Sequence, residues 1–249
     1  MSKVYIFDVD GTLTPSRLPM TDKFQKFFSE WVMINPFYLV TGSDLPKLKE
    51  QMRGLDIHSH GIFTCCGNEY WQTDPAVHPN HADNIYSNKF KPPETLLTYL
   101  GFQIKMSDFP IRAGNHREDR GSMLNFSIVG RDCTLEERQQ YFEWDNQNGE
   151  RERIAKEVRD GWPGIDAVIG GQISIDIYPE GNDKSQILDI IKQETIVQPD
   201  QYIFIGDRTM EGGNDYPLAK LMEKTENCKY YQTESWEQTQ KILEKLKND

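Results

Sequence analysis

The sequence predicts an α/β protein in which a mainly parallel sheet, covered by helices on both faces, is interrupted by a smaller inserted domain. Three observations support this fold class. Short apolar runs alternate with helical stretches in the first part of the chain, which is typical of a parallel sheet. The opening pattern, an apolar strand followed by an acid, returns near residue 202. Between these parts, from about residue 78, the alternation is lost.

The composition excludes several classes of protein. The chain has 249 residues, with 28 Lys and Arg against 39 Asp and Glu and a formal charge of −11, whereas a nucleic-acid surface needs a basic face. No apolar run approaches the roughly 18 residues of a membrane span, and the N-terminus lacks the apolar stretch of a signal peptide. The four cysteines show neither a metal-binding spacing nor a disulfide framework. We therefore expect a cytoplasmic protein with reduced thiols and with no nucleic-acid or membrane partner.

The first part of the chain predicts three strands separated by helices. Each expected strand is short, apolar and rich in residues that favour strands. Thr21 has the side chain of an N-cap for the first helix. The expected strands are 4–7, 37–40 and 62–66, and the expected helices are 21–32 and 45–53.

The middle of the chain predicts a smaller α+β unit. Thr134 and Glu137 form a capping-box pattern at the start of a helix. Farther on, isoleucines alternate with polar residues, as in a strand with one apolar face. The expected strands are 122–129 and 172–178, and the expected helices are 134–148 and 150–159.

The last part of the chain returns to the α/β pattern. Asp183 stands at the N-cap position of an expected helix over 184–192, residues 202–207 form an expected strand, and a closing helix begins at Ser235 with Gln238 three residues on.

These elements predict a discontinuous organisation. The core domain comprises residues 1–80 plus 184–249, and the inserted α+β domain comprises residues 81–183. Polar segments at both crossings would act as hinges.

Acidic residues follow two of the expected strands. Asp8 and Asp10 are two residues apart in an extended segment, so we expect their side chains to point the same way. Asp207 ends another strand, and open α/β sheets bind ligands beyond the carboxyl ends of their strands. A single acid at a strand end is usually a turn or capping residue. Three together would repel one another without a cation, and oxygen-only ligands favour Mg²⁺.

Phosphoryl transfer explains this set of residues. A carboxylate can attack phosphorus and form an aspartyl phosphate, and a second carboxylate can protonate the leaving oxygen and later deprotonate the incoming hydroxyl. The metal and a lysine, for which Lys184 is the candidate, neutralise the anionic phosphate. Thr41 or Ser43, at the end of the second expected strand, can hydrogen-bond the phosphate.

The same residues lie in four motifs of a known superfamily. The first motif of the haloacid dehalogenase superfamily resembles the segment Asp8-Val9-Asp10-Gly11-Thr12-Leu13-Thr14. The second, third and fourth motifs are similar, in the right order, to Thr41-Gly42-Ser43, Lys184 and Gly206-Asp207. The resemblance implies a Rossmannoid core with Asp8 as nucleophile, Asp10 as acid/base, and Mg²⁺ held by Asp8, the backbone carbonyl of Asp10 and Asp207.

One branch of this superfamily resembles most of the chain, and the likeness is weakest over 72–112 and 216–249. Several segments are similar to the eukaryotic-type phosphomannomutases: residues 120–125, 129–133, 136–138, 170–176 and 206–215. The resemblance implies that the inserted domain is a cap of the C2b type.

The arginines of the inserted domain indicate an anionic partner. Arginine forms bidentate bonds to phosphate, and Arg138 lies in the first turn of its helix, where the dipole disfavours a cation by about 0.3–1 kcal/mol. Pairing with neighbouring acids is the alternative for Arg138, and a solvated strand face is the alternative for Ser174 and Asp176. The resemblance implies that six residues bind the substrate: Arg17, Arg120, Arg131, Arg138, Ser174 and Asp176.

The resemblance also implies a reaction. Mannose 6-phosphate and mannose 1-phosphate would be interconverted through an aspartyl phosphate, with a hexose 1,6-bisphosphate as activator, in a step that feeds GDP-mannose synthesis. A homodimer through the cap is implied as well.

Departures from the family keep another enzyme class open. Thr41 stands where these mutases have glycine, and a hydroxyl there is commoner in phosphatases of the superfamily. A Mg²⁺-dependent sugar-phosphate phosphatase is therefore the alternative. A non-catalytic sugar-phosphate sensor or structural cap-dimer protein is disfavoured, because it would predict loss of at least one of the four motif residues Asp8, Asp10, Lys184 and Asp207.

Two further segments also depart from the family. Cys65-Cys66-Gly67-Asn68 replaces the family's Glu-Asn-Gly, and the segment after Asp215 does not match the loop that holds a second cation. No second metal site is assigned. Asn214 and Asp215 are expected to support Asp207 or its waters, and Thr41 is expected in the same supporting layer.

Overall fold

The computed structural model describes residues 2–73, 82–195 and 198–247, and the chain divides into two compact units. The first unit comprises Met1–Ser87, Asp183–Glu211 and Asp215–Asp249. The second comprises Asn88–Asn182 and Gly212–Asn214. The first crossing lies at residue 88, beyond the expected residue 81, because residues 82–87 form a strand of the first unit.

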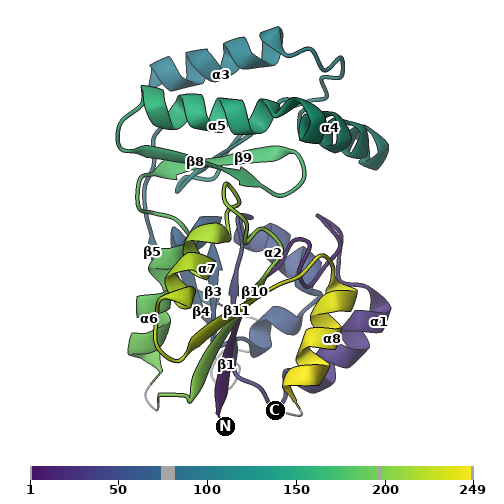
Figure 1. Cartoon of the computed structure of the whole chain (residues 1–249), viewed down its shortest axis with the longest axis vertical. Helices are drawn as coiled ribbons and strands as arrows, with labels where there is room; N and C mark the ends of the chain where they lie inside the picture. Colours follow the sequence, from purple (N-terminus) through teal and green to yellow (C-terminus); the bar gives the residue numbers. More distant parts are fainter. Residues whose placement is uncertain (1, 74–81, 196–197, 248–249) are drawn as a thin grey trace. The chain divides into compact units, whose positions relative to one another are not determined.

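Among the described residues, the first unit is built on a sheet of seven strands in the order β11-β10-β1-β2-β3-β4-β5 (Figure 1). Strands β11 to β3 are parallel to one another, and β4 and β5 add antiparallel pairs. The carboxyl ends of the parallel strands therefore share one edge. The strands are β1 Lys3–Asp8, β2 Phe37–Val40, β3 Gly61–Thr64, β4 Glu69–Thr73, β5 Ala82–Ser87, β10 Gln201–Gly206 and β11 Cys228–Gln232.

Alternate side chains of β1 enter two different apolar layers. Tyr5 and Phe7 pack in a layer with α1, α2 and α8, whereas Val4 and Ile6 pack in a layer with α6 and α7. Burial on both faces explains why the central strands are continuous apolar runs in the sequence. The helices are α1 Asp22–Trp31, α2 Leu45–Met52, α6 Ile187–Glu194, α7 Tyr216–Glu223 and α8 Trp236–Leu246.

Most of the predicted core elements are confirmed, with two corrections. The strand expected at 62–66 ends at Thr64, because Cys65 and Cys66 turn away in a 3₁₀ helix with left-handed φ values of 52° and 59°. Ser235 occupies the N-cap position of α8, but its side chain makes no cap hydrogen bond. The Gln238 side chain instead accepts a hydrogen bond from a backbone N–H one residue before Ser235.

The second unit contains an antiparallel sheet in the order β6-β7-β9-β8. Leu124 and Phe126 of β7 pack in an apolar layer with three helices. Side chains alternate along a strand, so Asn125 lies on the opposite face. The elements are α3 Glu94–Met106, β6 Arg117–Asp119, β7 Leu124–Ser127, α4 Leu135–Asn148, α5 Glu150–Gly161, β8 Ile165–Gly170 and β9 Ser174–Pro179.

Local sequence signals account for the edges of this unit. Thr134 and Glu137 form the expected capping box at the start of α4, and Gly149, with a φ of 64°, ends that helix and begins α5. Residues Gly212–Asn214 belong here because the Ile169 backbone N–H donates to the Gly212 carbonyl at 3.0 Å.

Among the described residues, none of the helices combines the length and the hydropathy that a membrane span requires. All four cysteines are thiols, as expected.

Candidate active site

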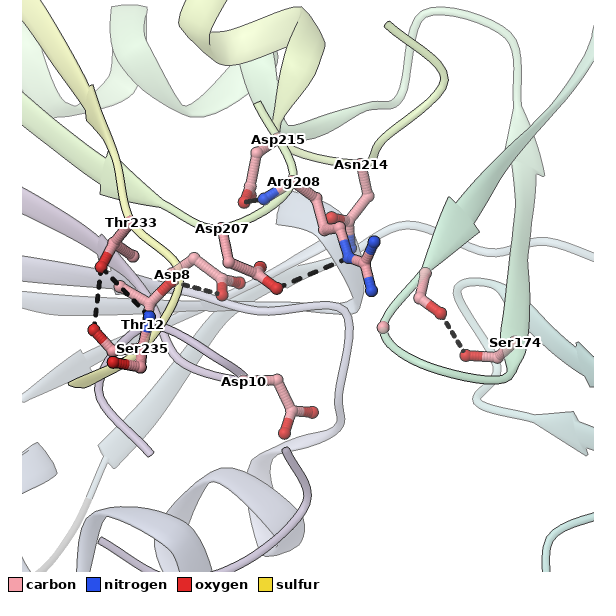
Figure 2. Close-up of polar contacts among 12 residues, drawn as sticks. Asp8, Asp10, Thr12, Ser174, Asp207, Arg208, Asn214, Asp215, Thr233 and Ser235 are labelled. Atoms are coloured by element: carbon pink, nitrogen blue, oxygen red, sulfur yellow. Dashed lines mark hydrogen bonds and ion pairs between the residues drawn. The ribbon is translucent and has the colours of Figure 1, made fainter. Parts of the chain in front are cut away.

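Three carboxylates gather at the carboxyl edge of the core sheet (Figure 2). Asp8 ends β1, Asp207 follows β10 directly, and Asp215 directly precedes α7. One carboxylate oxygen of each residue lies within 4.8 Å of the others. Asp8 and Asp215 are buried and Asp207 is partly exposed. An all-oxygen donor set of this kind fits Mg²⁺.

A buried lysine binds two members of this carboxylate cluster. Lys184 Nζ donates to Asp8 Oδ1 at 2.6 Å and to Asp215 Oδ1 at 2.7 Å, and the lysine is fully buried. Asp183 fixes the start of this segment, because its side chain accepts a hydrogen bond from the Ser185 backbone N–H. A buried cation is tolerated only with such partners.

Burial and crowding shift the pKa values of the cluster. Burial raises the pKa of Asp8 to about 7, and the opposing influence of Lys184 only partly offsets the combined effect of burial and Asp215. Burial, and then repulsion from Asp8, raises the pKa of Asp207 well above its ordinary value. Burial lowers the pKa of Lys184, but Asp215 and Asp8 outweigh it and hold that pKa well above its ordinary value. One lysine thus does not neutralise this site, and a divalent cation would.

The turn after β1 holds the second oxygen of Asp8. Thr12 Oγ1 donates to Asp8 Oδ2 at 3.1 Å, and the Thr12 carbonyl accepts a hydrogen bond from Thr239 of α8 at 2.8 Å. Gly11 has a φ of +83°, and a Cβ there would lie 2.6 Å from Asp207 Oδ2. Glycine therefore permits both the turn and the close approach of Asp207.

Both carboxylate oxygens of Asp215 accept hydrogen bonds. Its Oδ1 accepts from Lys184 and its Oδ2 accepts from the Arg208 backbone N–H at 2.9 Å. The Arg208 side chain also lies 3.5 Å from Asp207 Oδ2 (Figure 2). Asp215 is thus held as a support behind Asp8 and Asp207.

The carboxyl of Asp10 lies outside the cluster (Figure 2), so the expectation that the carboxyls of Asp8, Asp10 and Asp207 gather in one place is wrong. The chain leaves the extended conformation at this turn, and Asp215 takes the expected place of the Asp10 carboxyl. Asp10 Oδ1 accepts hydrogen bonds from the Arg17 backbone N–H and from Gln51 Nε2, the latter at 2.9 Å. Arg17 has a left-handed φ of 59° in the loop that follows.

The turns after β2 and β3 are joined. Thr41 is buried, and its Oγ1 accepts from the Ser43 backbone N–H at 3.1 Å. The Cys65 backbone N–H donates to the Ser43 carbonyl at 3.0 Å, and the Cys66 backbone N–H donates to the Thr41 carbonyl at 2.9 Å. Both expected phosphate-binding hydroxyls therefore lie beside the carboxyl edge of the sheet, on a segment that hydrogen bonds hold to the turn after β3.

In the second unit, two of the expected substrate-binding arginines share one carboxylate. Arg120 and Arg131 each place a guanidinium nitrogen on Glu118 Oε2, at 2.6 and 2.9 Å. Their side chains are only 6% and 10% exposed. Arg138 is buried in the first half of α4. Two guanidinium groups that converge on one oxygen can also receive a phosphate.

Ser174 and Asp176 are buried rather than solvated, so the solvated-face alternative is wrong. Ser174 Oγ donates to the Gly170 carbonyl at 2.8 Å (Figure 2). Asp176 Oδ1 accepts from Asn125 Nδ2 at 2.7 Å, and its Oδ2 accepts from Asn214 Nδ2 at 3.4 Å. A role of Asn214 beside Asp207 stays a prediction, since this hydrogen bond goes to Asp176.

Sequence reasoning did not assign several residues that contact the site residues. Thr12 and Asn125 stand in segments that resemble the family, but no role was assigned to them. Gln51 carried a different signal: with Leu48 and Met52 it lies at helical spacing on the buried face of α2, where a polar side chain is unusual. The residues are Thr12, Gln51, Glu118 and Asn125.

Known proteins match this chain in sequence and in fold. The family model of eukaryotic phosphomannomutases matches residues 23–248. A phosphomannomutase of Encephalitozoon cuniculi is 36% identical over 219 residues, covering 86% of this chain and 83% of the relative. One of Drosophila melanogaster is 35% identical over 219 residues, covering 86% and 84%.

Solved structures support the fold alone, because their sequence identity is low. An IMP-nucleotidase of Plasmodium falciparum superposes with a TM-score of 0.63 at 16% identity, covering 100% of this chain and 68% of its own. A haloacid dehalogenase-like hydrolase of Bacteroides thetaiotaomicron has a TM-score of 0.57 at 15% identity, covering 99% of this chain and 100% of its own.

Proposed function

The chain belongs to the eukaryotic phosphomannomutase family of enzymes, and on this premise we propose that it interconverts mannose 6-phosphate and mannose 1-phosphate. The observation that carries the proposal is the buried lysine, Lys184, which bridges Asp8 and Asp215 beside Asp207. A buried, charge-compensated carboxylate at a strand end is suited to attack phosphorus. The proposed catalytic residues are Asp8, Asp10, Lys184 and Ser43.

We propose Mg²⁺ as the cation of this site. The proposed ligands are the carboxylates of Asp8 and Asp207 and the backbone carbonyl of Asp10, and the all-oxygen cluster described above supports them. When bound, Mg²⁺ would neutralise these carboxylates and polarise the phosphoryl group. Asp215, Asn214 and Thr41 are proposed as supporting residues.

The chain's own residues carry each bond change. Asp8 attacks phosphorus, a bond forms between its oxygen and phosphorus, and the bond from phosphorus to the sugar oxygen breaks. Asp10 gives a proton to that sugar oxygen and takes one back when the sugar attacks the aspartyl phosphate. Lys184 compensates the negative charge of the phosphoryl group, and the Ser43 hydroxyl donates a hydrogen bond to it.

The second unit is proposed to act as the cap that binds the sugar and the non-reacting phosphate. The guanidinium pair on Glu118 supports this role, because a dianionic phosphate can replace one carboxylate there. The proposed substrate-binding residues are Arg17, Arg120, Arg131, Arg138, Ser174 and Asp176.

Several finer points belong to the same proposal. A hexose 1,6-bisphosphate would prime Asp8, and the product would feed GDP-mannose synthesis in the cytoplasm. A homodimer through a C2b-type cap is supported by the exposed apolar side chains Phe102 and Met106 on α3.

A sugar-phosphate phosphatase is the second candidate, and Thr41 favours it. Its hydroxyl is buried at the end of β2 and already accepts from the Ser43 N–H. A phosphatase would transfer the phosphoryl group from Asp8 to water. A mutase must shield the aspartyl phosphate from water until the sugar phosphate takes it.

Product analysis distinguishes the two candidates. Purified protein with Mg²⁺ and mannose 1-phosphate is expected to form mannose 6-phosphate, measured by ³¹P NMR, and glucose 1,6-bisphosphate is expected to accelerate it strongly. Asp8→Asn should abolish turnover, whereas Asp189→Asn, at an exposed position of α6, should retain it. Inorganic phosphate as the dominant product, with indifference to the bisphosphate, would contradict the mutase and favour the phosphatase.

A further inference from the structure

Gln51 is a polar side chain in an apolar position. It is fully buried on the face of α2 that also buries Leu48 and Met52. A buried amide without partners is costly, by about 1–3 kcal/mol. Both amide hydrogens of Gln51 are used: Nε2 donates to Asp10 Oδ1 at 2.9 Å and to Thr14 Oγ1 at 3.1 Å. Its Oε1 accepts no hydrogen bond from the described residues.

The two partners of Gln51 can only accept hydrogen bonds from it, and this decides which atom of its amide faces them. The Thr14 hydroxyl donates its single hydrogen to the Val9 carbonyl at 3.3 Å, so towards Gln51 it can only accept. An ionised Asp10 carboxylate is also only an acceptor. The amide nitrogen, and not the amide oxygen, must therefore face both groups, and Thr14 anchors that nitrogen against Asp10.

Gln51 and the loop backbone converge on the same atom of Asp10. Among the described residues, the hydrogen bonds that reach this carboxyl, from Arg17 N–H and from Gln51 Nε2, both end on Oδ1. Two donors on one oxygen fix the plane of the carboxyl and leave Oδ2 as the oxygen that can exchange a proton.

We propose that Gln51 is a positioning residue for proton transfer by Asp10. Its amide holds Oδ1 so that Oδ2 can give a proton to the sugar oxygen as the bond from phosphorus to that oxygen breaks, and can take a proton back in the reverse step. This inference rests on the proposed function, because it requires Asp10 to act as the acid/base.

Two phosphoryl donors separate positioning from a merely structural role. With a hexose 1,6-bisphosphate the leaving group is an alkoxide that needs a proton, whereas with acetyl phosphate the leaving group is acetate, which departs as a stable anion. Phosphorylation of Asp8 by each donor can be followed by rapid acid quench and intact-protein mass spectrometry. Gln51→Met is expected to slow phosphorylation by the bisphosphate about 10–100-fold and to leave phosphorylation by acetyl phosphate nearly unchanged.

The controls lie on the same helix and at Asp10. Met52→Leu, which changes a buried neighbour without a polar group, should leave both rates nearly unchanged. Asp10→Asn should show the same selective loss as Gln51→Met, at about 10²–10⁴-fold. If Gln51→Met does not fold, Gln51→Asn replaces it, since its amide is one methylene too short to reach Asp10 and should give the same selective loss.

The outcomes distinguish this inference from the proposed function. If Asp10→Asn slows phosphorylation by the bisphosphate alone while the Gln51 variants slow phosphorylation by both donors equally, or by neither, the positioning role is overturned. If Asp10→Asn does not slow phosphorylation by the bisphosphate more than phosphorylation by acetyl phosphate, the proposed acid/base role of Asp10 is refuted. The positioning role of Gln51, which depends on it, is then refuted as well.

Discussion

At the scale of single residues, the candidate site depends on close approaches that admit no extra atom. Lys184 lies between two buried carboxylates, and Asp207 lies against the backbone of Gly11. Burial, together with the nearby charge of Asp215, raises the pKa of Asp8 to about 7, although Lys184 acts in the opposite direction. The same crowding prepares the site for a cation.

A methyl group at residue 11 tests this packing. In Gly11→Ala the new Cβ would meet Asp207 Oδ2 at 2.6 Å, so Asp207 must move. We expect the Mg²⁺ concentration for half-maximal activity to rise about 10–100-fold, measured by magnesium titration of the mutase assay.

Gly54→Ala is the matched control for this variant. Gly54 has a similar φ of +87°, but a Cβ there would meet nothing within 4 Å. It should share the cost of a left-handed alanine, about 1–2 kcal/mol, and keep the normal magnesium requirement. Equal magnesium requirements in the two variants would refute the packing argument.

At the scale of elements, the candidate site residues of each unit stand on strands, helices and turns that otherwise bury apolar side chains. Helix α4 illustrates this: the capping box of Thr134 and Glu137 fixes its first turn, and Arg138 follows directly as a buried cation. The dipole at this end disfavours a cation but favours an anion bound beside it. With Arg138 as a proposed substrate-binding residue, the start of α4 would link the stability of the second unit to substrate binding.

Removing the cap of α4 should affect both properties. Thr134→Ala is expected to lower the free energy of unfolding by about 1 kcal/mol and to raise KM for mannose 1-phosphate more than it lowers kcat, because Arg138 is proposed to bind the substrate rather than to react. Denaturant unfolding and steady-state kinetics measure the two effects. Thr134→Ser retains the cap oxygen and should behave as the parent; a loss confined to kcat would count against the binding role.

Sequence patterns predicted some elements and missed others for physical reasons. β2 at Phe37–Val40 and the capping box of α4 were predicted because a buried apolar run and a cap are local signals. Helix α3 was missed, since it buries Leu96 and Leu100 yet exposes Phe102, and so lacks a clear polar face.

The candidate site follows the same division between local and long-range signals. The identities of Asp8, Lys184 and Asp207 are readable from motifs. The turn that directs Asp10 towards Gln51 depends on contacts between residues 41 positions apart, which no local pattern encodes.

At the scale of the whole molecule, metal binding should be coupled to stability and to pH. Without metal, folded Asp8 keeps its proton up to about pH 7, whereas in the unfolded chain it has its ordinary pKa of 3.8. Its contribution to stability is therefore complete below pH 4 and is lost as the pH rises to about 7. The raised pKa of Asp207 acts in the same direction. Mg²⁺ requires the deprotonated carboxylates, so protons compete with it at low pH.

Thermal unfolding with and without Mg²⁺ tests this coupling. At 100 times its Kd, Mg²⁺ is expected to stabilise the protein by about 2.7 kcal/mol at pH 8, which corresponds to a rise in Tm of about 5–10 °C. The rise should be clearly smaller at pH 5.5, absent in Asp207→Asn and retained in Asp189→Asn. An equal rise at both pH values would show that the metal does not bind through these carboxylates.

The pairing of β1 with β10 has a consequence for how the chain is made. Lys3 pairs with Gln201 across the sheet, whereas Asn88–Asn182 is one continuous stretch of a compact unit. A ribosome therefore releases the whole of that stretch before the centre of the core sheet can close. Asp8 emerges early, but Lys184 and Asp207 emerge only in the last third of translation, so the proposed nucleophile cannot meet these two partners until synthesis is nearly complete.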